Sequence, residues 1–182
     1  TNHEGHMGYV AQEYTLWPHL SVLENLTLAP MVRGRKKQEV QHDALQLLER
    51  FGLAEYMYAS VQSLSGGQRQ RVCIARALSL NPKFIICDES VSALDVSVQA
   101  QVLNLLNDLK REFKITYIFI SHDLSVVKFM SDRMVVMNKG KIEEMGDADE
   151  IYLNPKSDYT KNLISSIPKG QLTDIRASIE RK

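Results

Sequence analysis

Residues Phe84 to Glu89 read FIICDE, an apolar run that ends in two adjacent carboxylates. A short apolar run predicts a buried β-strand, here from Lys83 to Cys87. Ligands of parallel α/β proteins bind beyond the carboxyl ends of the strands. Asp88 is therefore placed to hold Mg²⁺, and Glu89 to polarise a water for attack on a γ-phosphate. A strand that ends in a solvated acidic turn is the alternative.

The segments after this strand alternate between helical and strand patterns. A buried strand at 116–120, a short helix at 124–130 and a hairpin at 134–144 are predicted. Such alternation predicts an α/β fold with a parallel sheet. The first element after FIICDE is an amphipathic helix from Val98 to Phe113, with an apolar face made of Val98, Val102, Leu105, Leu109 and Phe113.

The segments before this strand predict a helical region at about residues 21–80. Ser21 has Glu24 three residues on, which is the capping-box pattern that starts a helix. A second, amphipathic helix runs from Val40 to Phe51, and Gly52 suits its C-terminal end. These signals indicate a small helical subdomain.

The third helix of this region carries LSGGQ (Leu64 to Gln68) at its start and stops before Asn81-Pro82. It is predicted from Ser65 to about Leu80. Glycines let backbone N–H groups approach an anion closely, and the helix dipole favours negative charge at this end. The Ser65 hydroxyl adds a donor. An ordinary N-capped helix is the alternative, although five such residues in this order are rare by chance.

Composition and charge narrow the class of protein. The 182 residues carry 22 basic and 22 acidic side chains, and this balance does not indicate nucleic acid as a partner. No apolar run approaches the roughly 18 residues of a membrane-spanning helix. The two cysteines, Cys73 and Cys87, stand in apolar contexts, which predicts buried free thiols.

These motifs resemble those of the ABC transporter ATPases, in that family's order, over about residues 8–168. LSGGQ resembles the signature motif and FIICDE the Walker B strand. The resemblance implies an α/β fold: a partial P-loop NTPase core with a parallel sheet and an inserted helical subdomain. Three further motifs are similar to the Q-loop, the D-loop and the switch strand: GYVAQ (Gly8 to Gln12), SALD (Ser92 to Asp95) and ISHD (Ile120 to Asp123).

The resemblance implies a role for each motif residue. Asp88 would coordinate Mg²⁺, Glu89 would be the general base or position the water, and Gln12 would reach both metal and water. His122 would contact the γ-phosphate. Asp95 would link the two ATP sites of a dimer, although it also suits the cap of the helix that follows. The ATP bound by a second ATPase subunit would be clamped by Ser65, Gly66, Gly67 and Gln68.

The finer resemblance divides between two kinds of importer. Three stretches resemble oligopeptide and dipeptide import ATPases: residues 88–113, residues 121–146 and the C-terminal NPKSDYTKNLISSIP. In contrast, WPHLSVLENLTLAP resembles polar amino-acid importers. We expect peptide import, at the cytoplasmic face of the membrane and together with transmembrane permease subunits. Amino-acid import, a non-hydrolysing regulatory subunit and an ABC ATPase of DNA repair or ribosomes are the alternatives. Ser90 departs from the proline of many family members.

No G-x-x-x-x-G-K-[ST] phosphate loop occurs in the 182 residues. That loop supplies the lysine and the N–H groups that hold the β- and γ-phosphates of ATP. We therefore expect this chain alone to be inactive as an ATPase and to be a fragment of a longer protein. Residues 1–168 would form the partial ATPase domain, and residues 169–182 a polar tail.

Overall fold

The structure, a computed structural model, describes residues 7–166. The chain forms two compact units, Thr1–Ile118 and Phe119–Lys182. The predicted polar tail at 169–182 lies outside the described residues. Within residues 7–166, no helix is both long and apolar enough to cross a bilayer.

The helices of the first unit begin and end at local capping signals. The Ser21 hydroxyl accepts from the N–H of Glu24 at 3.2 Å, and the Glu24 carboxylate accepts from the N–H of Ser21 at 2.8 Å, as the capping box predicts. Gly52, at φ +65°, follows the second helix. The helices are α1 (Val22–Val32), α2 (Lys37–Arg50), α3 (Gly66–Leu78) and α4 (Val96–Phe113), with 3-10 turns at Ala54–Tyr56 and Val61–Ser63.

The strands form a sheet in the order β1–β2–β3. β1 and β2 are parallel, with Met7 opposite Phe84 and Val10 opposite Cys87, so their carboxyl ends meet at one edge. The predicted α/β fold with a parallel sheet is confirmed. The strands are β1 (Met7–Val10), β2 (Phe84–Asp88) and β3 (Thr116–Ile120).

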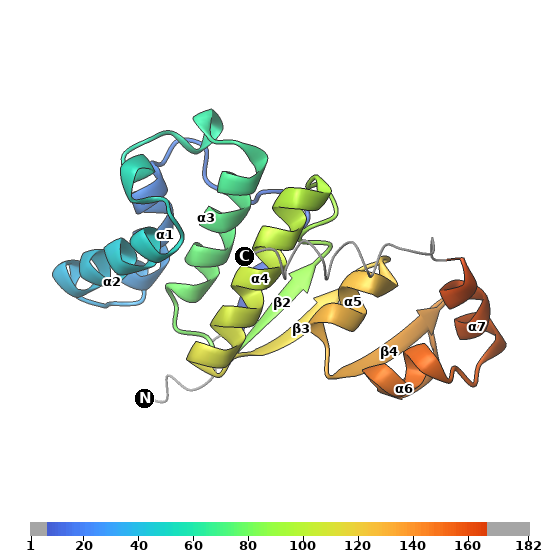
Figure 1. The fold of residues 1–182 in the computed structure, drawn as a ribbon. Helices are drawn as coiled ribbons and strands as arrows, with labels where there is room; N and C mark the ends of the chain where they lie inside the picture. The colour runs from blue at the N-terminus through green and yellow to red at the C-terminus, as the bar shows by residue number, and fades with distance from the viewer. Residues whose placement is uncertain (1–6, 167–182) are drawn as a thin grey trace. The chain divides into compact units, whose positions relative to one another are not determined.

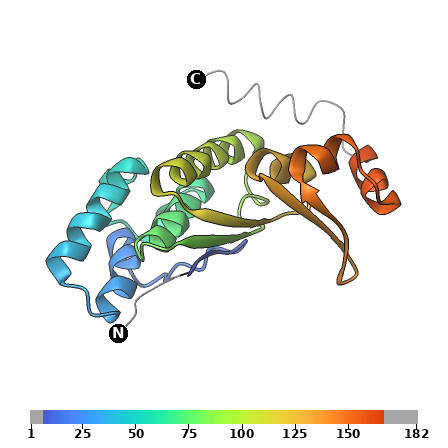
Figure 2. The same cartoon turned by 90° about the horizontal axis from the view of Figure 1, so that it is seen from below.

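Helix α3 covers one face of the sheet. A Cβ on Gly8 would lie 3.3 Å from the Cβ of Ala77, so β1 and α3 pack closely. Figures 1 and 2 show α3 and α4 side by side over the same face of β1 and β2. The predicted burial of residues 116–120 is wrong: Ile118 and Ile120 are 49% and 48% exposed, because alternate side chains of this strand point to an uncovered face.

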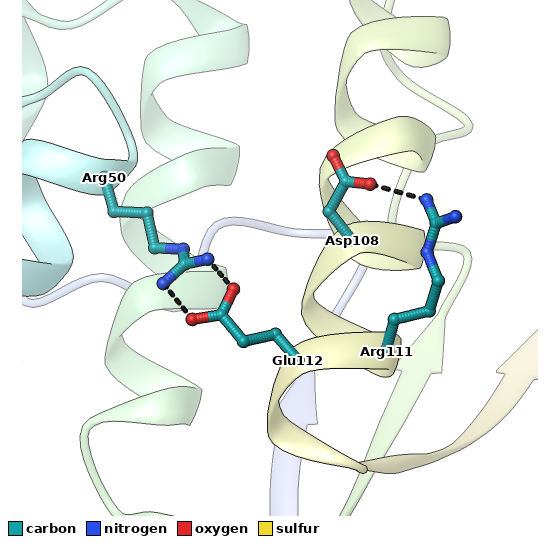
Figure 3. A network of polar contacts seen from close by, with 4 residues as sticks. All are labelled: Arg50, Asp108, Arg111 and Glu112. Carbon is teal, nitrogen blue, oxygen red and sulfur yellow. Dashed lines mark hydrogen bonds and ion pairs between the residues drawn. The ribbon is translucent and has the colours of Figure 1, made fainter.

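Helix α4 buries a face that matches the predicted one only in part, since Val102 and Leu109 are fully buried as predicted. Leu106 is fully buried, whereas Leu105 is half-buried and Phe113 is 41% exposed. The helix carries two adjacent apolar stripes, one with Leu103 and Leu106 and one with Leu105 and Phe113. The spacing in the sequence does not decide which stripe faces the core. Arg50 of α2 lies 5.4 Å from the centre of the Phe113 ring and pairs with Glu112. Figure 3 shows this ion pair between α2 and α4, beside a second pair within α4.

In its described residues, up to 166, the second unit consists of a hairpin and three short helices. Lys139 and Gly140 have φ of +47° and +78°, as a two-residue hairpin turn requires, so the predicted hairpin is confirmed. Its core consists of Leu124, Met134, Val136, Ala148 and Ile151. The elements are α5 (Leu124–Met130), β4 (Arg133–Asn138), β5 (Lys141–Asp147), α6 (Ala148–Leu153) and α7 (Asp158–Ser165).

Candidate functional site

The carboxyl edge of the sheet carries Asp88 and Gln12. Asp88 ends β2, and its Oδ2 accepts a hydrogen bond from the Tyr9 hydroxyl at 3.1 Å. This bond is the main cause that raises the pKa of Tyr9. Gln12 stands two residues beyond β1, and its side chain is exposed. The parallel pairing therefore brings an exposed amide and a carboxylate to one edge of the sheet.

Glu89, directly after β2, has a backbone conformation that is rare for its residue type. Its φ is +49°, in the left-handed region that L-residues other than glycine seldom occupy. The Glu89 carbonyl accepts from the N–H of Ser92 at 3.2 Å and from its hydroxyl at 2.8 Å. The turn at 89–92 thus fixes the backbone from which the Glu89 side chain projects. Strained backbone of this kind clusters at functional sites.

The LSGGQ loop begins α3 with a complete capping box. The Ser65 hydroxyl accepts from the N–H of Gln68 at 3.2 Å, and the Gln68 amide oxygen accepts from the N–H of Ser65 at 2.8 Å. The Ser65 hydroxyl keeps its own hydrogen to donate. The amides of Gly66 and Gly67, as the first of the helix, have no partner within it. These groups can together bind an anion.

Close contacts fix the position of this loop. A Cβ on Gly67 would lie 2.6 Å from Cγ1 of Val98, on α4. A Cβ on Gly66 would lie 3.1 Å from the Tyr14 hydroxyl and 3.8 Å from Cδ2 of Leu94. The loop therefore lies between the segment after Gln12 and the segment after the Walker B-like strand.

Asp95 caps α4. Its Oδ1 accepts from the N–H of Val98 at 3.0 Å, which is the capping role left open by the sequence. His122 belongs to the second unit, where it is exposed between β3 and α5. Asp123 caps α5 by accepting from the N–H of Ser125 at 2.8 Å. The chain direction after His122 is therefore fixed by a capped helix.

The donors at the sheet edge suit a hard cation that also binds phosphate. In the described part of the chain, no three histidine, cysteine or acidic side chains gather as a metal site. Mg²⁺ usually takes one or two protein oxygens and completes its octahedron with water and substrate phosphates. The Asp88 carboxylate and the Gln12 amide oxygen fit that pattern.

Sequence reasoning gave no role to four side chains at this site: Tyr9, which lies within GYVAQ, and Tyr14, Arg69 and Arg76, which lie outside the motifs. Tyr9 reaches Asp88 across 79 residues, and Arg76 reaches Thr15 across 61 residues. Pairing over such distances depends on strand register and helix packing, for which the local pattern has no signal. Only their aromatic or cationic character marks them as candidates.

Comparison with known proteins agrees with this geometry. The family profile described as "ABC transporter" matches residues 1–92. This chain belongs to the ABC transporter family. It is 47% identical over 160 residues to the oligopeptide transport ATP-binding protein OppF of Bacillus subtilis. It is 50% identical over 138 residues to the dipeptide transport ATP-binding protein DppF of Lactococcus lactis.

The aligned regions cover 83% and 74% of this ABC family chain, and 52% and 44% of these two relatives. The chain thus spans about half the length of the curated relatives it matches. Among solved structures, CbiO1 of Clostridium perfringens, part of the ABC transporter complex CbiONQ, matches with a TM-score of 0.75 and 25% identity. That match covers 92% of this chain and 66% of CbiO1.

Proposed function

We propose that this chain is part of an ATP-hydrolysing subunit that energises peptide import through a membrane ABC transporter. The observation that carries the proposal is the 45–50% identity to ATP-binding proteins for oligopeptide, dipeptide and glutathione transport. Polar amino-acid import was the sequence alternative, and these relatives favour peptides. Transmembrane permease subunits and a second ATPase subunit would be the partners, at the cytoplasmic face of the membrane.

The sheet edge would hold the metal and the attacking water. Asp88 would bind Mg²⁺, usually through water, with Gln12 near both metal and water. Bound Mg²⁺ would neutralise charge on the phosphates. Glu89 would accept a proton from the attacking water or orient it, and its turn would keep the carboxylate in place. His122 would contact the γ-phosphate.

The signature loop would act on the nucleotide of the second subunit. The amides of Gly66 and Gly67, the Ser65 hydroxyl and the positive end of the α3 dipole would bind that ATP's phosphates. The Gln68 side chain would keep the cap intact. Asp95, which caps α4 beside this loop, would link the two sites across the dimer.

The test is ATP hydrolysis by the complete protein, reconstituted with its permease subunits in proteoliposomes and supplied with peptide. Glu89→Gln removes the proton acceptor and keeps the shape, so we expect ATP binding with a loss of turnover of at least about 10²-fold. Exposed Glu49 on α2 supplies the matched control, Glu49→Gln, with unchanged turnover.

Two results would contradict this proposal in different ways. If Glu89→Gln hydrolyses ATP as fast as the wild type, Glu89 has no part in the chemistry. If the wild-type complex binds ATP without hydrolysing it, the subunit is regulatory.

A further inference from the structure

Arg76 on α3 holds the segment that follows Gln12. It donates from Nη1 to the Thr15 carbonyl at 2.6 Å and from Nη2 to Thr15 Oγ1 at 2.8 Å. Its guanidinium carbon also lies 5.0 Å from the centre of the Trp17 ring. A planar guanidinium can make the paired donation and the ring contact at once, whereas a lysine ammonium cannot. One side chain thus makes three contacts with a three-residue stretch.

Arg69 makes a parallel contact near the start of the same helix. It lies seven residues before Arg76, about two turns away and so on the same stripe of α3. Its guanidinium carbon is 4.9 Å from the centre of the Tyr14 ring. The Tyr14 hydroxyl in turn lies against Gly66, in the signature loop. A continuous row of contacts therefore joins the 14–17 segment to α3, from its first residue to its last turn.

The far end of this segment is fixed to α1. The buried Asn25 side chain accepts from the N–H of Trp17 at 2.9 Å and donates to the Trp17 carbonyl at 3.2 Å. With Trp17 fixed from α1 and Thr15 from α3, the stretch that begins at Gln12 has few ways to move independently. A displacement of α3 must then displace this stretch as well.

Burial strengthens the Arg76 contacts. The side chain is half-buried between the loop and the helix, and this desolvation lowers the pKa of Arg76 from its usual value. Hydrogen bonds and cation–π contacts are stronger where water is partly excluded. Loss of the guanidinium shape would leave the Thr15 carbonyl without this donor.

We propose that Arg76 is a positioning residue that joins the Gln12 segment to the signature helix, so that both loops move as one body when ATP binds. The inference rests on the proposed function, in which Gln12 lies near the metal and LSGGQ clamps the second ATP. Arg76 itself touches neither. Through Arg76, a movement of the signature loop would also move the Gln12 segment. The rate of hydrolysis would therefore respond to the transport partner.

The first test uses hydrogen exchange, read by mass spectrometry, on the complete protein. Arg76→Lys keeps the charge and removes the paired donation, so we expect amides of residues 12–17 to exchange about tenfold faster. Arg71→Lys is the matched control, because Arg71 lies on the same helix and bonds instead to Gln101 at 2.8 Å. Its exchange at 12–17 should equal that of the wild type. Equal exchange in Arg76→Lys would overturn the proposal.

The second test measures coupling in the complete transporter, reconstituted in proteoliposomes. We expect Arg76→Lys to lower the ratio of peptide-stimulated to basal ATP turnover towards one, and Arg71→Lys to keep the wild-type ratio. A merely structural defect lowers both rates together and leaves the ratio unchanged, so an unchanged ratio would also overturn the proposal. Absence of turnover in the wild type would instead overturn the proposed function, and the coupling role with it.

Discussion

At the scale of single residues, Glu89 combines a proposed catalytic role with an unfavourable backbone conformation, at φ +49°. A left-handed φ costs an L-residue roughly 1–2 kcal/mol. Glycine does not pay this cost, but its greater conformational entropy in the unfolded chain offsets part of the gain. We therefore expect Glu89→Gly to raise the free energy of unfolding by about 1 kcal/mol while abolishing turnover. Glu89→Gln, which keeps the strain, should unfold like the wild type. Urea titration measures both, and a destabilised glycine variant would show that the Glu89 side chain supports the fold.

At the scale of elements, Gly67 sets how closely α3 approaches α4. Alanine has the higher helix propensity, by about 1 kcal/mol, so Gly67→Ala would stabilise α3 if space allowed. Its Cβ would instead lie 2.6 Å from Cγ1 of Val98, a β-branched side chain with little rotameric freedom. We expect a net loss of about 1–3 kcal/mol in the free energy of unfolding.

The pair Gly67→Ala and Val98→Ala tests this cause by a double-mutant cycle. If the clash is responsible, the double variant loses less stability than the sum of the two single variants, by at least about 0.5 kcal/mol. Additive losses would assign the effect to something other than the α3–α4 contact. Gly66→Ala is a useful comparison, because its one tight contact would be with the hydroxyl end of Tyr14, at 3.1 Å, while Cδ2 of Leu94 would lie at an ordinary 3.8 Å.

Elements with local signals were predictable, and contacts between elements were not. The capping box at Ser21 depends on two residues that are three apart in the sequence. Helix α5 has the predicted bounds because it too starts at a local cap, the Asp123 side chain. The buried face of α4 depends on which of two apolar stripes meets α3, so Phe113 was misassigned. The motifs predicted that Gln12 and Asp88 follow strands. The Tyr9–Asp88 bond could not be predicted without the register of β1 on β2. The Arg76 contacts could not be predicted without knowing how the 14–17 segment packs on α3.

At the scale of the whole molecule, two buried thiols link stability to alkaline pH. Cys73 and Cys87 are free and buried, as predicted. Burial raises the pKa of Cys73 to about 11 and that of Cys87 to about 12, from an ordinary value of 9.0. Below pH 9 both states hold the protonated thiols and stability is complete. Between pH 9 and the folded pKa values, only the unfolded chain ionises, so stability falls as pH rises.

The loss should be on the order of 2 kcal/mol per thiol by about pH 10.5, since each unit of pKa difference corresponds to about 1.4 kcal/mol. Lysines and tyrosines titrate in the same range, so the informative quantity is the difference between the wild type and Cys73→Ala/Cys87→Ala. Alanine leaves a small cavity at each site, and this lowers stability equally at every pH. We expect the free energies of unfolding of the two proteins to converge from pH 8 to pH 10.5. Parallel curves would mean that the thiols meet water in the folded chain, and that the core between the sheet and α3 is open in solution.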